Sequence, residues 1–177
     1  MQHANFLLLM PLLLPLVHIL AACCSATQAR WRVSFGLSAA GLVAALASGL
    51  LALNFGTADM PRVLVSSAPA SHVLAVLVGF LGLIIGRFSR NYLAGERRAQ
   101  RFLMNFHVAL AAVSLVVLTD HLLLLLVAWI GISLALHELL VLYPDRPRAA
   151  LAAHKKFLFA RLAEIGAADQ GQALRVA

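Results

Sequence analysis

The sequence predicts an all-α, polytopic membrane helix bundle, and two observations carry that prediction. Of its 177 residues, 62% are hydrophobic and only 12% are charged, a composition that excludes an ordinary water-soluble domain. The hydrophobic residues fall in five stretches, and the basic residues fall in alternate gaps between them. A helix needs ~20 apolar residues to cross a hydrocarbon core about 30 Å thick. We therefore expect about five transmembrane helices.

The expected spans cover residues 5–24, 33–55, 69–88, 102–119 and 121–143. The first has no basic segment before it and is followed by further spans, so it is not expected to be a cleaved signal peptide. The second is rich in Gly, Ala and Ser, which predicts close packing in the middle of the bundle. The clearly apolar part of the third, residues 72–86, is short, so four spans plus a re-entrant segment is the alternative. The last two form a hairpin, and Pro144 ends the fifth.

The distribution of positive charge predicts the orientation. Of the 14 Lys and Arg residues, all except Arg62 fall on one side of the membrane in this arrangement. The positive-inside rule makes that side cytoplasmic, with the N-terminus outside and the C-terminus inside. Residues 1–145 are then the transmembrane domain, and residues 146–177 form a basic amphipathic helix and tail facing the cytoplasm and the membrane lipids. The net charge of +7 is thus a topology signal, and no nucleic-acid partner is expected.

Several kinds of site are not expected. Cys23 and Cys24 are adjacent at the cytoplasmic end of the first span, and adjacent cysteines rarely meet disulfide geometry. We expect free thiols there. The sequence has no CxxC or HxxxH motif, so it predicts no metal site. It also shows no cofactor motif and no nucleophile–base arrangement, so the chain is not expected to be an enzyme by itself.

The candidate functional residues are ionisable groups inside the spans. Glu138 is the only carboxylate in an expected span, and an acid at mid-bilayer costs at least ~2.5–3.5 kcal/mol. His137 is adjacent to it, and His107 lies at a similar depth on the preceding helix. We predict a titratable proton-relay cluster of His107, His137 and Glu138. The alternative is that each caps a helix end, bonds a carbonyl or, for Glu138, anchors at the interface or pairs with an arginine there. His18, alone in the first span, is interpreted as a hydrogen-bonded structural residue.

The second half of the chain resembles the antiporter-like membrane subunits of the respiratory complex I superfamily, the NuoL type. Residues 88–96 read FSRNYLAGE, which is similar to that family's YSxxYMxG loop with its following acid, and Tyr92 occupies the Tyr position. Trp129 matches the Trp of a GWExxG motif. Residues 152–166 resemble AAxKAFxxxRxGDxG, with Lys155, Arg161 and Glu164 at motif positions. The resemblance covers roughly residues 85–166.

Within that superfamily, the chain looks closest to DabB, the membrane subunit of bacterial inorganic carbon transporters. The run WIGISLALHELL at 129–140 carries the pattern, because it has the Trp without the family's functional Glu, replaced here by Ile130. The resemblance implies a bacterial inner-membrane location and a large cytoplasmic partner, DabA, a zinc protein similar to a carbonic anhydrase. It implies that cation flow through this subunit drives one-way CO2 hydration in that partner.

Two other functions stay open. A proton-translocating subunit L of NADH-quinone oxidoreductase, or a cation antiporter subunit, is the nearest alternative, and Ile130 argues against it. A membrane anchor that holds a peripheral partner and transports nothing is the third. Family members continue through more helices than this chain has, so it is expected to be a fragment or a short member.

Overall fold

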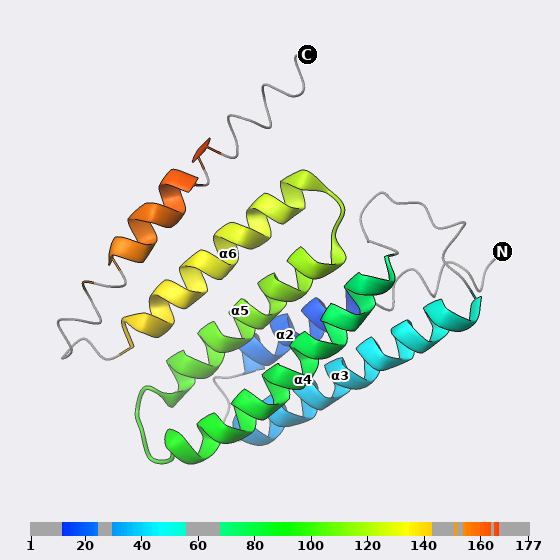
Figure 1. Cartoon of the computed structure of the whole chain (residues 1–177). Helices are drawn as coiled ribbons and strands as arrows, with labels where there is room; N and C mark the ends of the chain where they lie inside the picture. Colours follow the sequence, from blue (N-terminus) through cyan, green and yellow to red (C-terminus); the bar gives the residue numbers. More distant parts are fainter. Residues whose placement is uncertain are drawn as a thin grey trace.

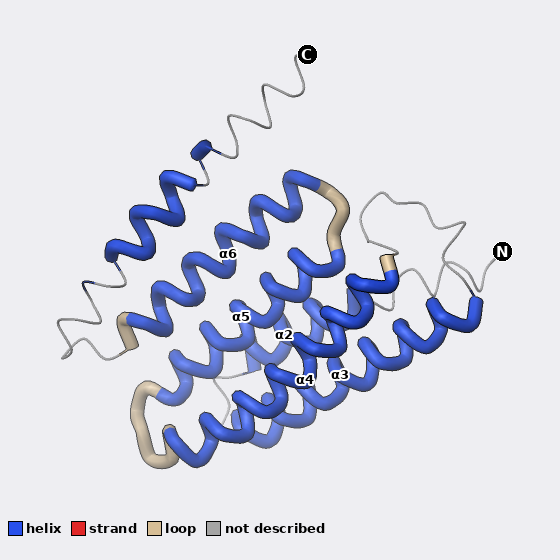
Figure 2. Tube along the Cα trace, in the orientation of Figure 1, coloured by secondary structure: helices blue, strands red, loops and turns tan. Residues whose placement is uncertain are grey.

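The protein is entirely α-helical in the part of the chain that the structure describes. The computed structural model describes residues 12–24, 30–55, 68–142, 151, 154–163 and 165–166. Its main helices are α2 (Leu13–Cys24), α3 (Arg30–Phe55), α4 (Pro69–Tyr92), α5 (Ala99–Leu118) and α6 (Leu122–Leu140). Figure 2 shows them as nearly parallel rods, with short loops between α4 and α5 and between α5 and α6. The all-α membrane bundle expected from the sequence is confirmed.

Four of these helices are long and apolar enough to cross a membrane, namely α3, α4, α5 and α6. The described part of the first expected span, α2, is a shorter apolar helix of 12 residues. The short third stretch is one continuous helix of 24 residues, because Arg87, Phe88 and the residues up to Tyr92 extend it. At 1.5 Å per residue it is about 36 Å long, which is enough for a full crossing.

Helix α5 is the central helix of the described bundle. Helix α2 contacts both α3 and α5, α4 also contacts both, and α6 packs on the other side of α5. In Figure 1 this places the lime-coloured α5 between α6 and the group formed by α2, α3 and α4. In the most apolar 18-residue stretch of each helix, 56% of the residues are buried for α5 and 28% for α3. The expectation that span 33–55 lies in the middle of the bundle is therefore wrong, and α5 holds that place.

Small side chains set how closely the helices approach. The buried face of α3 carries Ser34, Ser38, Ala45 and Ser48, spaced at one or two helical turns. The apolar core lies where this face meets α2, α4 and α5, at Leu14, Ala45, Ala75 and Leu118. Many large apolar side chains point outward instead, including Val43 and Val73, which are 64% and 69% exposed. A lipid-facing surface explains that arrangement, since a water-facing one would carry a large apolar patch.

A helical segment at 154–163 follows the bundle and folds back along α6 (Figure 1). The Lys156 ammonium donates a hydrogen bond to the Ser133 carbonyl at 3.1 Å, and Phe157 packs against His137. The basic helix expected at 146–177 thus packs, in its described part, on the outer side of α6. Leu158, Phe159 and Leu162 on the same segment are exposed, and its predicted contact with the membrane lipids stays a prediction.

Candidate functional site

A buried chain of polar side chains joins three helices. His18 on α2 and His107 on α5 approach with their Nδ1 atoms 3.2 Å apart, and Ser34 Oγ on α3 lies 2.6 Å from His107 Nε2. Both histidines are 0% exposed and Ser34 is 5% exposed. The rings of His18 and His107 stack with their centroids 5.5 Å apart. In an apolar bundle, such a connected polar chain is the principal candidate for a function inside the membrane.

Helical periodicity brings these three residues to one place. One face of α2 is buried and the other exposed: the buried residues are Leu14, Pro15, His18, Ala21 and Ala22, and the exposed ones include Leu13, Leu16, Ile19 and Leu20. On α5, His107 lies on the buried face, and the Phe106 ring meets it edge-on with centroids 5.4 Å apart. Each helix therefore directs its polar residue into the same junction. The alternative for His107 at the sequence level, a bond to a backbone carbonyl, is not what the structure shows.

One ring nitrogen in this chain of three polar side chains has no hydrogen-bond partner among the described residues. His18 Nε2 is buried and makes no hydrogen bond to any residue that the structure describes. It faces α3 near Gly41, where an added Cβ atom would lie 3.9 Å from it. A buried polar atom without a partner costs roughly 1–3 kcal/mol, so such an atom indicates a function or a bound water. His18, which the sequence suggested was only structural, is thus part of the candidate site.

A cavity between α3 and α4 reaches the other end of this chain. Its walls include Ser34 and Ser38 together with Trp31, Arg32, Arg87 and Arg90. The Arg87 guanidinium lies over the Phe35 ring, 5.9 Å from its centroid. Arg32, Arg87 and Arg90 are exposed, so the cavity has a positively charged rim, and its other lining residues include the buried Ser34 and Ser38. Ser34 therefore both lines the cavity and contacts His107 through its hydroxyl oxygen.

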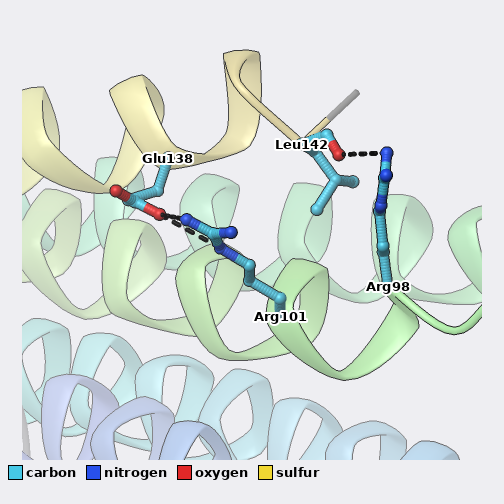
Figure 3. A network of polar contacts seen from close by, with 4 residues as sticks. All are labelled: Arg98, Arg101, Glu138 and Leu142. Carbon is cyan, nitrogen blue, oxygen red and sulfur yellow. Dashed lines mark hydrogen bonds and ion pairs between the residues drawn. The ribbon is translucent and has the colours of Figure 1, made fainter. Parts of the chain in front are cut away.

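Glu138 lies in a different environment. Its carboxylate pairs with the Arg101 guanidinium, whose Nε and terminal nitrogen both donate to Oε2 (Figure 3). The two side chains are 42% and 56% exposed, and they join α6 to the start of α5. Nearby, Arg98 donates to the Leu142 carbonyl at 2.9 Å and ties the α4–α5 loop to the end of α6. Among the sequence alternatives, Glu138 takes the pairing with a neighbouring arginine.

His137 contacts neither the His18–His107–Ser34 chain nor the Glu138–Arg101 pair in the described structure. Its ring packs edge-on against His154, at 5.7 Å between centroids, and against Phe157, at 5.1 Å. Its Nδ1 atom is buried without a hydrogen-bond partner. The described structure joins His107, His137 and Glu138 by no hydrogen bond, ion pair or ring contact. The structure therefore does not bring the predicted cluster together, although each residue's role in proton transfer stays a prediction.

Sequence reasoning overlooked Ser34 and undervalued His18, but a signal for both was present. In the expected topology, His18, Ser34 and His107 all lie within about two turns of the cytoplasmic ends of their helices. Polar side chains at equal depth on neighbouring apolar helices are natural partners. The sequence does not reveal which helices are neighbours, so α2 and α5 could not be paired in advance.

The family-motif positions are spread over the surface of the bundle. Tyr92 is 68% exposed at the end of α4 and stacks on Phe88, and the loop after it turns through Gly95, whose φ of +83° favours glycine. Trp129 on α6 is 51% exposed. Lys155 is exposed, and the Arg161 guanidinium lies 5.1 Å from the Phe157 ring centroid. Glu164 lies outside the described residues.

No group of three or more His, Cys, Asp or Glu side chains in the described segments could hold a metal ion. Cys23 and Cys24 form no disulfide bond with any described residue. The site thus offers hydrogen-bond donors, hydrogen-bond acceptors and titratable imidazoles. This chemistry suits the movement or binding of a proton, a small anion or water.

Four apolar helices of membrane-crossing length, with hydrogen-bonded imidazoles buried between them, define a multi-pass membrane protein. Comparison with known proteins gives the particular kind. The chain is 39% identical over 160 residues to the "Probable inorganic carbon transporter subunit DabB" of Hydrogenovibrio crunogenus, covering 88% of this chain and 30% of that protein. It is 35% identical over 137 residues to DabB2 of Halothiobacillus neapolitanus, covering 74% of this chain and 25% of that one.

A second group of relatives covers less of the chain. The NADH-quinone oxidoreductase subunit L of Escherichia coli is 30% identical over 93 residues, which is 52% of this chain and 15% of that subunit. No protein-family model matches the chain. The chain spans about a third or less of the length of these relatives. The chain belongs to the family of membrane proteins that includes DabB and NADH-quinone oxidoreductase subunit L.

Proposed function

We propose that this chain is a membrane subunit of an inorganic carbon transporter, in which proton movement through the bundle is coupled to CO2 or bicarbonate uptake. The similarity to DabB carries this proposal, because it covers 88% of the chain, whereas the similarity to the E. coli subunit L covers 52%. Ile130, at the position where the subunit L motif has its functional glutamate, supports the same choice. The His18–His107–Ser34 chain supplies titratable groups inside the membrane that proton coupling requires.

The partner in this proposal is a large zinc-containing protein of the DabA type on the cytoplasmic side. The charge distribution supports that orientation, because Arg32, Arg87, Arg90, Arg98 and Arg101 all lie toward one end of the bundle. The surface at that end includes the exposed α4–α5 loop and the nearby Arg101–Glu138 pair. The location is then the bacterial inner membrane, with the N-terminus outside and the C-terminus in the cytoplasm. The chain itself is not an enzyme in this proposal.

A chimera tests the function. The 160 residues of Hydrogenovibrio DabB that match this chain are replaced by the corresponding residues of this chain, and the chimera is expressed with its DabA-type partner. Uptake of radiolabelled inorganic carbon is measured in a host that lacks carbonic anhydrase. We expect the chimera to restore uptake and to co-purify with the partner. A matched chimera tests the complex I alternative. In it, the aligned 93 residues of E. coli subunit L are replaced by those of this chain, and proton pumping is measured.

The outcomes separate three functions. Uptake with the DabB chimera and no pumping with the subunit L chimera supports carbon transport. Pumping without uptake supports the complex I alternative and rules out the proposal. Partner binding without either activity supports a membrane anchor. Loss of partner binding as well would contradict both the transporter and the anchor.

A further inference from the structure

A relay requires donors and acceptors within hydrogen-bond distance, and the buried chain meets that condition at each described link. From the cavity inward, the order is Ser34 Oγ, His107 Nε2, His107 Nδ1, His18 Nδ1 and His18 Nε2. The two links between residues measure 2.6 Å and 3.2 Å, within the range of ordinary hydrogen bonds. Each imidazole connects its two ends through one ring. The three side chains therefore form a continuous path from α3 through α5 to α2.

The Nδ1–Nδ1 contact requires that one ring donates and the other accepts, and this condition allows two arrangements. In the first, the Ser34 hydroxyl donates to His107 Nε2, His107 Nδ1–H donates to His18 Nδ1, and His18 carries its proton on Nε2. In the second, His18 Nδ1–H donates to His107 Nδ1, and His107 Nε2–H donates to Ser34 Oγ. His18 Nε2 is then a bare lone pair. Both rings are neutral in both arrangements, which suits a site that is 0% exposed.

We infer that Ser34, His107 and His18 form a proton relay between the arginine-rimmed cavity and the buried face of α3 at Gly41. In one passage, His18 Nε2 gives its proton to a water molecule beside Gly41, and His107 Nδ1 passes its proton to His18 Nδ1. Ser34 Oγ then passes its proton to His107 Nε2 and takes one from water in the cavity. One proton enters, one leaves, and the first arrangement becomes the second. The reverse passage carries a proton the other way.

Two further observations support the relay over a purely structural role. A structural histidine normally has both ring nitrogens hydrogen-bonded, whereas His18 Nε2 is buried without a partner in the part of the chain that the structure describes. The outer end of the chain also opens on a cavity. The positive rim formed by Arg32, Arg87 and Arg90 disfavours an extra charge at rest. Protons are therefore passed through neutral tautomers, with no imidazolium stored. The inference rests on the proposed proton coupling and names its groups.

The test measures how fast the ring N–H protons of His18 and His107 exchange with water. The full chain, carrying isotope-labelled histidine, is studied by NMR in lipid nanodiscs, and His18→Asn and His107→Asn assign the two rings. Ser34→Ala removes the only described link to the cavity, so exchange at both rings should slow by about 10²-fold. Ser34→Thr keeps the hydroxyl and should keep the exchange rate. Ser38→Ala alters the same cavity without touching the rings and is the matched control.

Wild-type exchange that is fast, slowed by Ser34→Ala and kept by Ser34→Thr supports the relay. Exchange in Ser34→Ala that is as fast as in the wild type, or a ring that holds one tautomer without exchange in the wild type, overturns it. This readout needs neither inorganic carbon nor a partner. A chimera that fails to take up carbon while the exchange pattern holds would therefore contradict the proposed function alone.

Discussion

At the scale of single residues, the arginine–carboxylate pair shows how location decides what a charge contributes. Glu138 and Arg101 are about half exposed, so their attraction is screened where headgroups and water reach them. Such a pair contributes little to folding, about 0.2–1 kcal/mol. Its position, between the beginning of α5 and the end of α6, is more informative. It holds together two helices that carry separate candidate groups.

Replacing either partner tests this pair. Glu138→Gln leaves the Arg101 guanidinium without its counter-charge, and we expect inorganic carbon uptake by the DabB chimera to fall. The charge-swapped variant Glu138→Arg with Arg101→Glu restores the attraction and should recover part of the uptake. Thermal unfolding of the single and double variants should give a coupling free energy of roughly 0.2–1 kcal/mol.

Unchanged uptake in Glu138→Gln would show that the carboxylate has no role in transport. Asp120→Asn is the control, because Asp120 is an exposed carboxylate at the opposite end of α5 and has no ion pair with any described residue.

At the scale of helices, close packing depends on a few positions without a side chain. Gly79 on α4 lies against the α3 backbone, where an added Cβ would be 3.3 Å from the Leu42 Cα atom. A backbone atom cannot turn aside as a leucine methyl can. By contrast, an added Cβ at Gly36 on α3 would meet nothing within 4 Å. The contact between α3 and α4 matters for the candidate site, because the cavity beside Ser34 is formed by these two helices.

Alanine at these two glycines should have opposite effects. Gly79→Ala forces α3 and α4 apart by a few tenths of an ångström, and we expect the free energy of unfolding to fall by about 1 kcal/mol. Gly36→Ala adds no clash and removes backbone freedom, so it should raise that free energy by about 0.5–1 kcal/mol. Thermal unfolding of both variants in nanodiscs measures the difference. Equal stability of the two variants would contradict the close approach at Gly79.

At the scale of the whole molecule, the bundle is asymmetric in charge. Its basic end carries Arg32, Arg87, Arg90, Arg98 and Arg101, while the α5–α6 turn at the other end carries Asp120 and His121. Figure 1 shows the α4–α5 loop, which lies at the basic end, and the α5–α6 turn at opposite ends of α5. The bilayer converts such asymmetry into a fixed orientation during insertion.

Single cysteines report that orientation. In a chain with Cys23→Ser and Cys24→Ser, Ala94→Cys is placed in the α4–α5 loop and Asp120→Cys in the α5–α6 turn. Both positions are exposed. A membrane-impermeant maleimide added to intact spheroplasts should label Asp120→Cys, and Ala94→Cys should react only after lysis. The reverse pattern would contradict an outside N-terminus, and labelling of both positions would contradict an intact bundle.

The sequence by itself determined the class of the protein, the helices and the direction of the charge asymmetry. These properties depend on local composition, since ~20 apolar residues make a span wherever they occur and arginines concentrate on one side. The resemblance to DabB and subunit L was also readable from short runs such as 88–96 and 129–140, and the comparisons confirm it. Even the short third stretch was recoverable, because its polar ends continue the helix.

Only the tertiary structure decided which polar residues meet. His107 was singled out for its depth, but its partners, His18 and Ser34, are 89 and 73 residues away in the chain. Glu138 was singled out for its charge, and its carboxylate turned out to be held by Arg101, 37 residues away. Depth in the bilayer can be counted along a helix. The side on which each helix meets its neighbours depends on how small residues on α3 and the buried faces of α2 and α5 fit together, and that fit is a property of the packed bundle.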